Sequence, residues 1–455
     1  MSGDLRTFVQ RLEESGELVR VSDELSTQHE IAAATKYVAQ HEGKAVLFER
    51  AKDYDVPIVA NLLGSRERVA MAFDVKEHDL DETYLARAQN RIKPVVVTSA
   101  PVQEVVIESE IDIGRTLPVL THHEKDAGPY MTSAITIAKD PETGVRGMGL
   151  HRIQVKDKDT IGIFLATPPL SHFLTKAEQQ GKPLQIAVAS GVAPLTFCAA
   201  IFFAPQGVDK FEIAGGFAQA PIELVRCRSV DIEVPADAEF ILEGSIIPQQ
   251  REKEGPFGES TGYYFTYDNP VAKIKAISHR AKPIYHALLP FSGEERVLTS
   301  FMLGSYTLRQ VRKALPQVRR MHIQLSGEIV IVQIEKKSED DGAKVIDYLL
   351  SNPFAKIVVV TDGDVNISDL DEVAWAVGTR VQFDRDVTVK SDLPGLMIDP
   401  STSGGEKTPD LSQLTTRTAK IGIDATKPLS ELEKFERIDV PQEVKQKIWR
   451  ILEKR

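Results

Sequence analysis

Cysteine and long apolar runs are both scarce in this sequence of 455 residues. Only Cys198 and Cys227 are present, and neither has neighbours typical of a metal site or a nucleophile. The longest apolar stretch without charge, residues 191–204, is too short to span a bilayer, is interrupted by Pro194 and is expected in the core. The N-terminus lacks the apolar core of a secretory signal. These absences predict a cytoplasmic protein without a membrane partner.

Basic residues are few relative to acidic ones. The chain has 55 Lys and Arg against 66 Asp and Glu, which gives a net charge of -11 and a pI near 5.5. No cluster interleaves basic with aromatic residues, so nucleic acid is an unfavourable partner. The rest of the composition is ordinary for a soluble globular protein, with 42% hydrophobic and 27% charged residues. The length allows two or three domains.

Three regions differ in the periodicity of their apolar residues, which predicts a multidomain chain of the α/β and α+β classes. Residues 1–115 begin with an amphipathic helix and continue with short β-rich runs between helical stretches, a pattern typical of an α/β domain. Strands dominate residues 116–300, which indicates a closed or split antiparallel β-barrel. Residues 301–455 alternate helix and strand, and end in a charged helix over residues 429–454 that could dock on a neighbour.

The hexapeptide EGPFGE places Glu254 and Glu259 around a constrained segment. Gly255 and Gly258 permit backbone angles closed to other residues, and Pro256 fixes one dihedral angle. The sequence therefore predicts a rigid corner that aims both acids at one point. The six residues alone leave open a second interpretation, an acidic surface turn.

Arg152 is the cation best placed to meet these acids. In GLHRIQVKD, alternation puts Leu150, Arg152 and Gln154 on one face of a predicted strand. The guanidinium could clamp a carboxylate in a bidentate fork, or it could form a salt bridge at the barrel rim. With Arg152 between two carboxylates, one Glu would hold the guanidinium, and the other, desolvated near a like charge, would keep its proton near neutral pH.

Several motifs occur in a fixed order along the chain: DLRTFVQRLEESGELVRV, VLFERAKDYDVPIVANLLGSRERVA, DPETGVRGMGLHRIQVKDKDTIGI, IELVRC, ILEG, EGPFGE and WAVGTRVQFDRD. This succession covers nearly the whole length and resembles the UbiD family of decarboxylases. The resemblance implies reversible, non-oxidative decarboxylation of an aromatic, heteroaromatic or α,β-unsaturated carboxylic acid with prenylated FMN. It also implies a flavin-reductase-like split barrel in the central domain and oligomerisation through the C-terminal one.

The family pattern assigns roles to the residues singled out above. Arg152 would orient the substrate carboxylate, Glu254 would hold Arg152, and Glu259 would supply the proton that replaces carbon dioxide. The resemblance also implies a set of cofactor-binding residues: Gly147, Met148, Leu150, His151, Arg152, Ser171, His172, Lys210 and Lys420.

The phosphate site departs from the family pattern, which holds a divalent metal with Asn, His and Glu. The Asn position is Gly147, and His172 matches the histidine. The glutamate position appears as Lys210, with Glu212 two residues on. His172 and Glu212 are thus the candidate ligands of manganese, with potassium as a possible companion. Alternatively, the ammonium of Lys210 could neutralise the phosphate, and Gly147 would let backbone N–H groups approach. A third interpretation makes Lys210 a solvated surface lysine.

The resemblance also implies that the segment HALLPFSGEERVLTSFML lies beside the cofactor, where it would set substrate selectivity. Its apolar residues, together with His286 and Arg296, suit a flat aromatic or heteroaromatic ring that bears a polar group or a second carboxylate. Alternatively, both polar residues face solvent or another subunit. A flavin prenyltransferase would supply the cofactor, and the protein is expected to be a homodimer or a larger homo-oligomer.

Two other functions compete with a lyase. A flavin-binding oxidoreductase or cofactor carrier on a similar barrel would use EGPFGE only as a turn, and a catalytically silent relative would explain the altered metal positions. Residues 117–126, rich in His and Thr, are expected to be a connector. In VVVTDGDVN, Asp362 and Asp364 predict a turn rather than a magnesium site.

Overall fold

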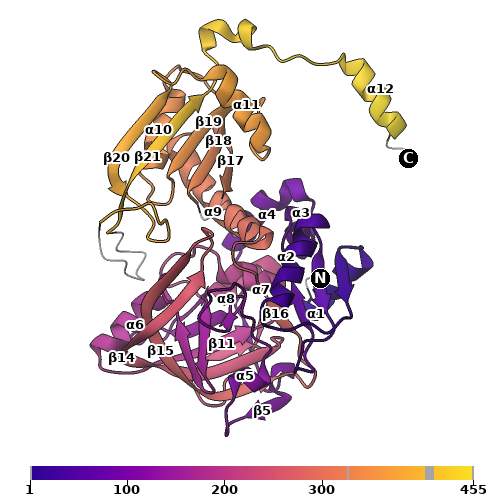
Figure 1. The fold of residues 1–455 in the computed structure, drawn as a ribbon, viewed down its shortest axis with the longest axis vertical. Coiled ribbons are helices and arrows are strands. Elements are labelled where there is room, and N and C mark those ends of the chain that lie inside the picture. Colours follow the sequence, from indigo (N-terminus) through magenta and orange to yellow (C-terminus); the bar gives the residue numbers. More distant parts are fainter. Residues whose placement is uncertain (1–2, 325–326, 405–414, 453–455) are drawn as a thin grey trace.

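The computed structural model of the protein describes residues 3–324, 327–404 and 415–452. Figure 1 shows a lower body that contains the N-terminal and central sheets, and an upper body formed by the C-terminal region. Helix α9 (Gly293–Ala314) connects the two, and helix α12 (Gln442–Leu452) stands away from both. None of the helices in the described ranges is long and apolar enough to cross a membrane.

The N-terminal sheet has the order β1-β2-β3-β16, and its last strand comes from far along the chain. Strand β16 (Tyr285–Ala287) pairs in parallel with β3. This differs from the prediction that residues 116–300 form the central barrel. Asp4 caps α1 by accepting a hydrogen bond from the backbone N–H of Thr7 at 3.0 Å, and the apolar face of α1 is buried. The elements before the central sheet are α1 (Leu5–Glu14), β1 (Leu18–Val21), α2 (Glu30–His41), β2 (Ala45–Phe48), β3 (Ile58–Ala60), α3 (Arg66–Phe73), η1 (Glu77–Asp79) and α4 (Leu80–Gln89).

The central sheet has nine strands in the order β6-β9-β10-β15-β14-β11-β7-β8, with β5 paired to β15. Only His151 and Arg152 separate β8 from β9 along the chain, so the two ends of the sheet lie next to each other. No pairing between β8 and either β6 or β9 is found in the described residues, and closure into a split barrel stays a prediction. The strands are β5 (Val105–Ile107), β6 (Tyr130–Met131), β7 (Ile135–Lys139), β8 (Arg146–Leu150), β9 (Ile153–Asp157), β10 (Thr160–Ile163), β11 (Leu184–Ser190), β14 (Phe240–Gly258) and β15 (Tyr264–His279).

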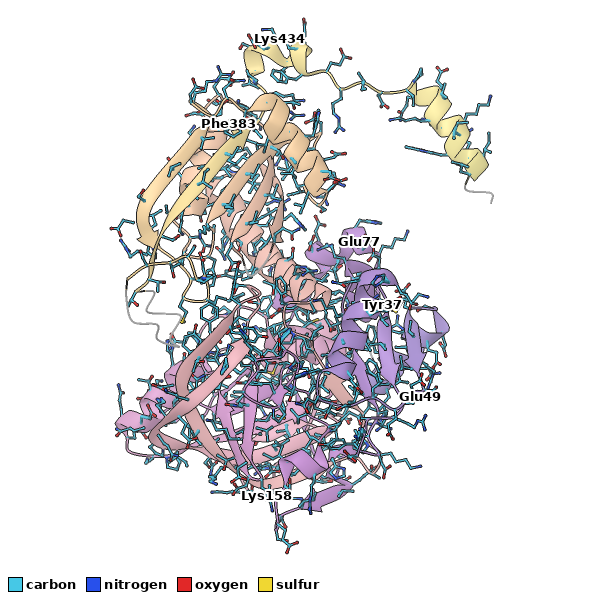
Figure 2. All side chains as sticks on the ribbon, viewed as in Figure 1. Tyr37, Glu49, Glu77, Lys158, Phe383 and Lys434 are labelled. Atoms are coloured by element: carbon cyan, nitrogen blue, oxygen red, sulfur yellow. The ribbon has the colours of Figure 1, made fainter. Side chains whose placement is uncertain are left out.

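Apolar side chains cover both faces of this sheet. Figure 2 shows how densely side chains fill the lower body around it. Along β11, Ala187 and Ala189 pack with α1, α3 and α4, whereas Ile186 and Val188 pack on the other face with α2 and β2. Because alternate residues of a strand face opposite sides, β11 reads as an unbroken apolar run. The expectation that residues 191–204 lie in the core is confirmed for residues 191–200, which are all buried, but not for residues 201–204, where Phe203 is 45% exposed. The remaining elements of this body are β4 (Val95–Val97), η2 (Pro101–Gln103), α5 (Ile113–Thr116), α6 (Leu170–Gln179), α7 (Pro194–Ala200), α8 (Lys210–Ala218), β12 (Glu223–Arg226) and β13 (Glu233–Pro235).

The upper body is a five-stranded sheet in the order β17-β18-β19-β21-β20, in which β18, β19 and β21 are parallel. The predicted terminal helix over residues 429–454 is wrong at its start: η3 is a short 3₁₀ segment, and α12 begins only after Pro441, which disfavours helix at Val440. The end of that prediction, residues 453–454, lies outside the described residues. The elements are β17 (Val318–Gln324), β18 (Ile329–Ile334), α10 (Asp341–Leu350), β19 (Ile357–Asp362), α11 (Leu370–Arg380), β20 (Val387–Pro394), β21 (Arg417–Ala425) and η3 (Leu429–Phe435).

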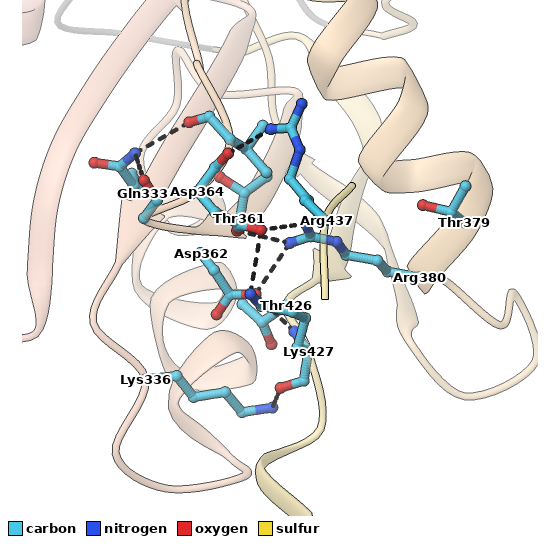
Figure 3. Close-up of polar contacts among 12 residues, drawn as sticks. Gln333, Lys336, Thr361, Asp362, Asp364, Thr379, Arg380, Thr426, Lys427 and Arg437 are labelled. Carbon is cyan, nitrogen blue, oxygen red and sulfur yellow. Dashed lines mark hydrogen bonds and ion pairs between the residues drawn. The ribbon is translucent and has the colours of Figure 1, made fainter. Parts of the chain in front are cut away.

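Ion pairs fasten the segment after β21 to the carboxyl end of β19 (Figure 3). The buried guanidinium of Arg380 contacts Asp362 at 3.1 Å and Asp364 at 2.9 Å, and Lys427 Nζ donates to Asp364 at 3.1 Å. Arg437 Nη1 donates to the carbonyl of Asp364 at 2.7 Å. Both acids at this turn are therefore neutralised by the protein's own cations.

A buried carboxylate joins α1 to the central sheet. Glu239 is fully buried and accepts two hydrogen bonds of 2.8 Å from the guanidinium of Arg6. We expect Arg6→Ala to destabilise this attachment by about 1–3 kcal/mol, because it removes charge-assisted hydrogen bonds from a buried acceptor. Amide hydrogen exchange of residues 5–14 should then become about 5- to 150-fold faster.

The matched control is Arg20→Ala, which removes an exposed pair with Glu13 and Glu49. That change should cost less than about 1 kcal/mol. Equal exchange rates of residues 5–14 in Arg6→Ala and the unmodified protein would contradict the expected role of Glu239.

Candidate active site

Arg152 lies in the two-residue link between β8 and β9, and not inside a strand as the alternation predicted. Its Nε donates to Glu254 Oε1 at 3.0 Å and its Nη2 to Glu254 Oε2 at 2.7 Å, which makes a bidentate pair. Its Nη1 donates to Glu259 Oε1. Glu254 is 0% exposed, and Arg152 and Glu259 are each 9% exposed. The structure thus brings the three singled-out residues into one buried cluster.

Polar neighbours complete the surroundings of Glu254. Asn269 Nδ2 donates to Glu254 Oε2 at 2.7 Å, so this carboxylate receives three hydrogen bonds from two side chains. Burial, together with the charge of Glu254, raises the pKa of the Tyr130 phenol well above its usual range, so Tyr130 stays neutral. Because a buried polar group is costly without partners, the hydrogen bonds from Arg152 and Asn269 compensate the burial of Glu254.

EGPFGE forms the end of β14, and the predicted turn is instead a bulged strand. Glu254 pairs with Tyr267, and Phe257 pairs with Phe265. Three steps along β14 therefore oppose two steps along β15, so β14 contains one extra residue.

This bulge explains how two acids five positions apart reach one guanidinium. In a regular strand, an odd spacing would point Glu254 and Glu259 to opposite faces. The extra residue makes the spacing effectively even. Gly255 is required there, because its φ is 108° and a Cβ would lie 2.5 Å from the carbonyl oxygen of Phe265.

Aromatic rings cover the guanidinium. The Cζ atom of Arg152 lies 4.1 Å from the ring centre of Phe164, 4.7 Å from that of Phe257 and 5.7 Å from that of Tyr267. These cation–π contacts stabilise the charge and exclude water from the cluster. Sequence reasoning missed all three rings, because they are distant in sequence and no spacing relates them to Arg152.

The C-terminal body contributes the outer layer of this aromatic cover. Met397 is 3% exposed and packs with Phe265 and Tyr267. Next to it, the carbonyl of Ile398 accepts a hydrogen bond of 2.8 Å from Thr261 Oγ1, in the turn that follows Glu259. The loop after β20 is therefore in direct contact with the catalytic strand pair.

Lys210, the first residue of α8, and His151, which directly follows β8, are both buried. Lys210 is 7% exposed, so it is no surface lysine, and its Nζ donates to the carbonyl of Ala200 at 2.7 Å. Burial lowers the pKa of Lys210 to about 7. Burial, and next the charge of Lys210, lower the pKa of His151 to about 4, so this imidazole is neutral. An anion bound here would compensate the buried ammonium.

The residues around Gly147 serve packing. A Cβ at Gly147 would lie 2.7 Å from both Phe173 and Pro169, so this glycine lets α6 approach β8. Met148 is buried in the core and Leu150 is partly buried beside it. These neighbours fill the space that a Cβ at Gly147 would need.

The candidate metal ligands are not assembled into a site. His172 is exposed on α6, while the adjacent Ser171 has a buried hydroxyl without a partner. Glu212 on α8 is paired with Arg91 at 3.8 Å. Across the described ranges, no three His, Cys, Asp or Glu side chains are close enough to hold a metal ion. The residues therefore do not fit the three-ligand manganese site of the family.

Lys420 lies in the upper body and does not join the cluster. It is 2% exposed within β21, and its Nζ donates to the carbonyl of Asn352 at 2.6 Å, at the C-terminal end of α10. Burial lowers its pKa to about 8. In this arrangement the ammonium satisfies carbonyls at a helix end.

His286 and Arg296 have different surroundings. His286 on β16 is 3% exposed, and its ring is tilted against that of Phe197 with ring centres 5.5 Å apart. Both of its ring nitrogens are buried without hydrogen-bond partners. Burial lowers its pKa to about 4, so it is neutral. Arg296 is exposed on α9, which agrees with the interpretation that it faces solvent.

The chain belongs to the UbiD family of carboxy-lyases. The N-terminal, Rift-related and C-terminal domains described for 3-octaprenyl-4-hydroxybenzoate carboxy-lyase match residues 9–88, 93–293 and 298–425. The anhydromevalonate phosphate decarboxylase of Methanothermobacter thermautotrophicus is 34% identical over 439 residues, which cover 95% of this chain and 99% of the relative. The protein is therefore a UbiD-type decarboxylase, and not an oxidoreductase or a cofactor carrier on a similar barrel.

Solved structures agree with this assignment. The UbiD-class enzyme HmfF from Pelotomaculum thermopropionicum, in complex with FMN, superposes with a TM-score of 0.90 at 41% identity and covers 96% of this chain and 98% of its own. The open form of vanillic acid decarboxylase from Sedimentibacter hydroxybenzoicus superposes with a TM-score of 0.85 at 31% identity, covering 99% of both chains. An evolved dimeric form of HmfF was solved with prFMN.

The bulge at Gly255 gives a prediction for the site. We expect Gly255→Ala to reduce decarboxylation about 100-fold, because the new Cβ displaces the strand that aligns Glu254 with Glu259. Gly144→Ala is the matched control: its φ is also positive, at 71°, but no atom lies within 4 Å of the new Cβ. It should cost about 1 kcal/mol of stability and leave activity unchanged. Turnover measured on both variants decides this, and full activity of Gly255→Ala would contradict the bulge as the aligning feature.

Proposed function

We propose that the protein uses prenylated FMN to decarboxylate an aromatic, heteroaromatic or α,β-unsaturated carboxylic acid. The observation that carries the proposal is the buried cluster in which Glu254 fixes Arg152 and Glu259 contacts its remaining Nη1 nitrogen. The HmfF complexes with FMN and prFMN support the choice of cofactor. When bound, prenylated FMN supplies the electron sink for the bond that breaks. We also infer that the central sheet curls around this cofactor as a split barrel.

Arg152 and Glu254 would bind and orient the substrate. The bidentate pair to Glu254 fixes the plane of the guanidinium, which leaves Nη1 as the donor directed toward the site. The substrate carboxylate would approach this donor. Phe164 and Phe257 keep water from the guanidinium, which strengthens its attraction for an anion.

Glu259 would hold and deliver a proton. Decarboxylation converts a carboxylate and one proton into carbon dioxide and a C–H bond, so each turnover needs one proton at the reacting carbon. Arg152 contacts only one oxygen of Glu259, whereas it donates hydrogen bonds to both oxygens of Glu254. Its second oxygen is the one suited to carry the proton.

We expect Glu259→Gln to retain cofactor and lose net carbon dioxide release by at least about 100-fold, since an amide cannot deliver the proton that makes the reaction go to product. Arg152→Ala should in addition raise KM. Glu252→Gln, on the exposed part of the same strand, is the control and should remain active. Cofactor absorbance and carbon dioxide release are the measurements, and full turnover by Glu259→Gln would refute the assigned role.

The cofactor phosphate would be held by Lys210 in place of most of a metal's role. The support is chemical: a buried ammonium with a carbonyl as its hydrogen-bond acceptor fits an anion, and His151 Nδ1 and Ser171 Oγ are buried without partners. His172 on the adjacent α6 would assist. Gly147, Met148, Leu150 and Lys420 remain proposed cofactor contacts from the family resemblance alone.

Lys210 makes the binding of ordinary FMN dependent on pH. A bound phosphate would raise the pKa of Lys210 above the value of about 7 that burial gives it. The resulting gain in affinity is complete below pH 7 and is lost as the pH rises, so FMN should bind more weakly at pH 9 than at pH 7. Lys210→Met should weaken binding and abolish this dependence, whereas Lys182→Met, at an exposed lysine, should not. Quenching of FMN fluorescence measures both, and equal affinity at the two pH values in the unmodified protein would refute the proposal.

His286 would recognise a polar group on the substrate ring. Its two unpartnered nitrogens are buried, and a buried polar group gains most from a ligand that satisfies it. A flat aromatic or heteroaromatic acid with a second polar group meets this need, and an aliphatic acrylic acid does not. Arg296 would contribute only if substrate entry or a second subunit brings it near.

We expect His286→Ala to reduce kcat/KM about 10-fold for furan-, pyrrole- or benzene-type acids that carry a second polar group. Cinnamic-type acids should be affected less. Arg296→Ala, at the exposed position, should change neither. A strong preference for cinnamic acids that survives His286→Ala would contradict the assignment.

Two partners complete the proposal. A flavin prenyltransferase would supply the cofactor. A second copy of the chain would cover α12, which has no buried residue and in which Val444, Ile448 and Trp449 are 48%, 44% and 56% exposed. An amphipathic helix without a partner on its apolar face supports a homo-oligomer.

A further inference from the structure

Asn269 is a buried residue of β15, the strand that pairs with the end of β14. Buried and exposed side chains alternate from Phe265 to Asn269, so Asn269 lies on the same face of β15 as Tyr267. Tyr267 is opposite Glu254 in the register, and Asn269 is opposite Glu252. Asn269 is therefore the diagonal neighbour of Glu254, a position from which side chains on adjacent strands can meet.

The two ends of the Asn269 amide have unequal surroundings. Its Nδ2 donates to Glu254 Oε2 at 2.7 Å, whereas its Oδ1 is buried and finds no hydrogen-bond partner among the described residues. A flipped amide would place its oxygen against a carboxylate oxygen, so only the N–H end suits this contact. A buried acceptor without a donor destabilises a fold. What Asn269 contributes against this cost is therefore the hydrogen bond to Glu254.

This hydrogen bond restrains a motion that Arg152 alone leaves open. The fork from Arg152 holds the guanidinium and the Glu254 carboxylate in one plane. The bond that joins a carboxylate to its side chain rotates over a broad range, so the two groups could tilt together. Donation from Asn269 fixes Oε2 from a second strand and opposes that tilt. Because Nη1 belongs to the same planar guanidinium, its direction is fixed as well.

We propose that Asn269 is a positioning residue for decarboxylation: it holds the plane of the Glu254 carboxylate and thereby directs Arg152 Nη1 at the substrate carboxylate. The proposal rests on the proposed function, in which Nη1 binds that carboxylate. Asn269 acts through Glu254, transfers no proton and forms no covalent bond. Its effect is on orientation, and a small error in the orientation of a reacting group costs an enzyme much of its rate.

The contact can be tested without catalysis by thermal unfolding at pH 8. Asn269→Asp should lower the midpoint, because it sets a second carboxylate against Glu254. Glu254→Gln should also lower it, because Arg152 loses a carboxylate partner. In the double variant the new amide can donate to the new carboxylate, so its loss should be smaller than the sum of the two single losses. Losses that add would overturn the contact, whatever the activity of the protein.

The pH dependence of Asn269→Asp reports on the same contact. The introduced carboxyl group donates to Glu254 only while it keeps its proton, so its function should be lost as the pH rises. The nearby phenols do not titrate in this range, because burial raises the pKa of Tyr267 to about 12 and that of Tyr130 well above its usual range. The charged or titratable groups around the contact are Arg152, Lys156, Glu252, Glu254, Glu259, Tyr130 and Tyr267.

Turnover by cofactor-loaded protein between pH 5 and 9 tests the positioning role. Asn269→Leu, a change to a side chain of similar shape, should retain cofactor absorbance but lose about 10-fold or more in kcat/KM at every pH. Asn269→Asp should lose little at pH 5 and progressively more toward pH 9. Asp268→Asn, at the exposed neighbouring position, is the control and should change neither kcat/KM nor its pH profile. Unchanged kcat/KM in Asn269→Leu, or the same pH profile for Asn269→Leu and Asn269→Asp, would overturn the role. Inactive unmodified protein would instead refute the proposed function and leave the unfolding result intact.

Discussion

The bidentate contact between Arg152 and Glu254 is the interaction on which the rest of the site depends. Both groups are buried, so neither could stay charged without the other, and the fork fixes the guanidinium in one plane. Asn269 and three aromatic rings complete the surroundings of the pair. A buried pair of this kind contributes orientation more than stability. Here the pair leaves Nη1 of Arg152 as the nitrogen that contacts Glu259. Under the proposed function, the substrate carboxylate would lie beside this nitrogen.

The residues that surround this pair come from segments that are far apart in the sequence. The link between β8 and β9 supplies Arg152, and the bulged end of β14 supplies Glu254. Glu259 directly follows β14, and the loop after β20 places Met397 on the aromatic cover. The loop before β6 holds the same strand from the other side through Asp126. Because the C-terminal body touches the turn that follows Glu259, any movement between the two bodies would displace Glu259, the proposed proton donor.

Sequence alone singled out Arg152, Glu254 and Glu259 as residues that should meet, because EGPFGE combines glycine and proline with two acids and GLHRIQVKD places an arginine in a predicted strand. It described their local structure incorrectly, since a bulge depends on the partner strand, and the sequence of β14 does not specify its register with β15. It assigned β16 to the wrong sheet for the same reason: pairing with β3 is a contact between distant residues. The contact of Asp126 with the end of β14 was not predicted, because a hydrogen bond between one carboxylate and a backbone N–H leaves no periodic pattern. Lys210 was found, but only the structure shows that it is buried.

Isotope exchange tests most directly whether Arg152 and Glu259 have the separate roles proposed for them. Under the proposed function, Arg152 orients the carboxylate for cleavage, and Glu259 delivers the proton in a separate step. With cofactor-loaded protein and ¹³C-labelled carbon dioxide, Glu259→Gln should still place the label in the carboxylate of the recovered acid while forming no decarboxylated product. Loss of exchange together with product, or formation of product at the unmodified rate, would contradict the account.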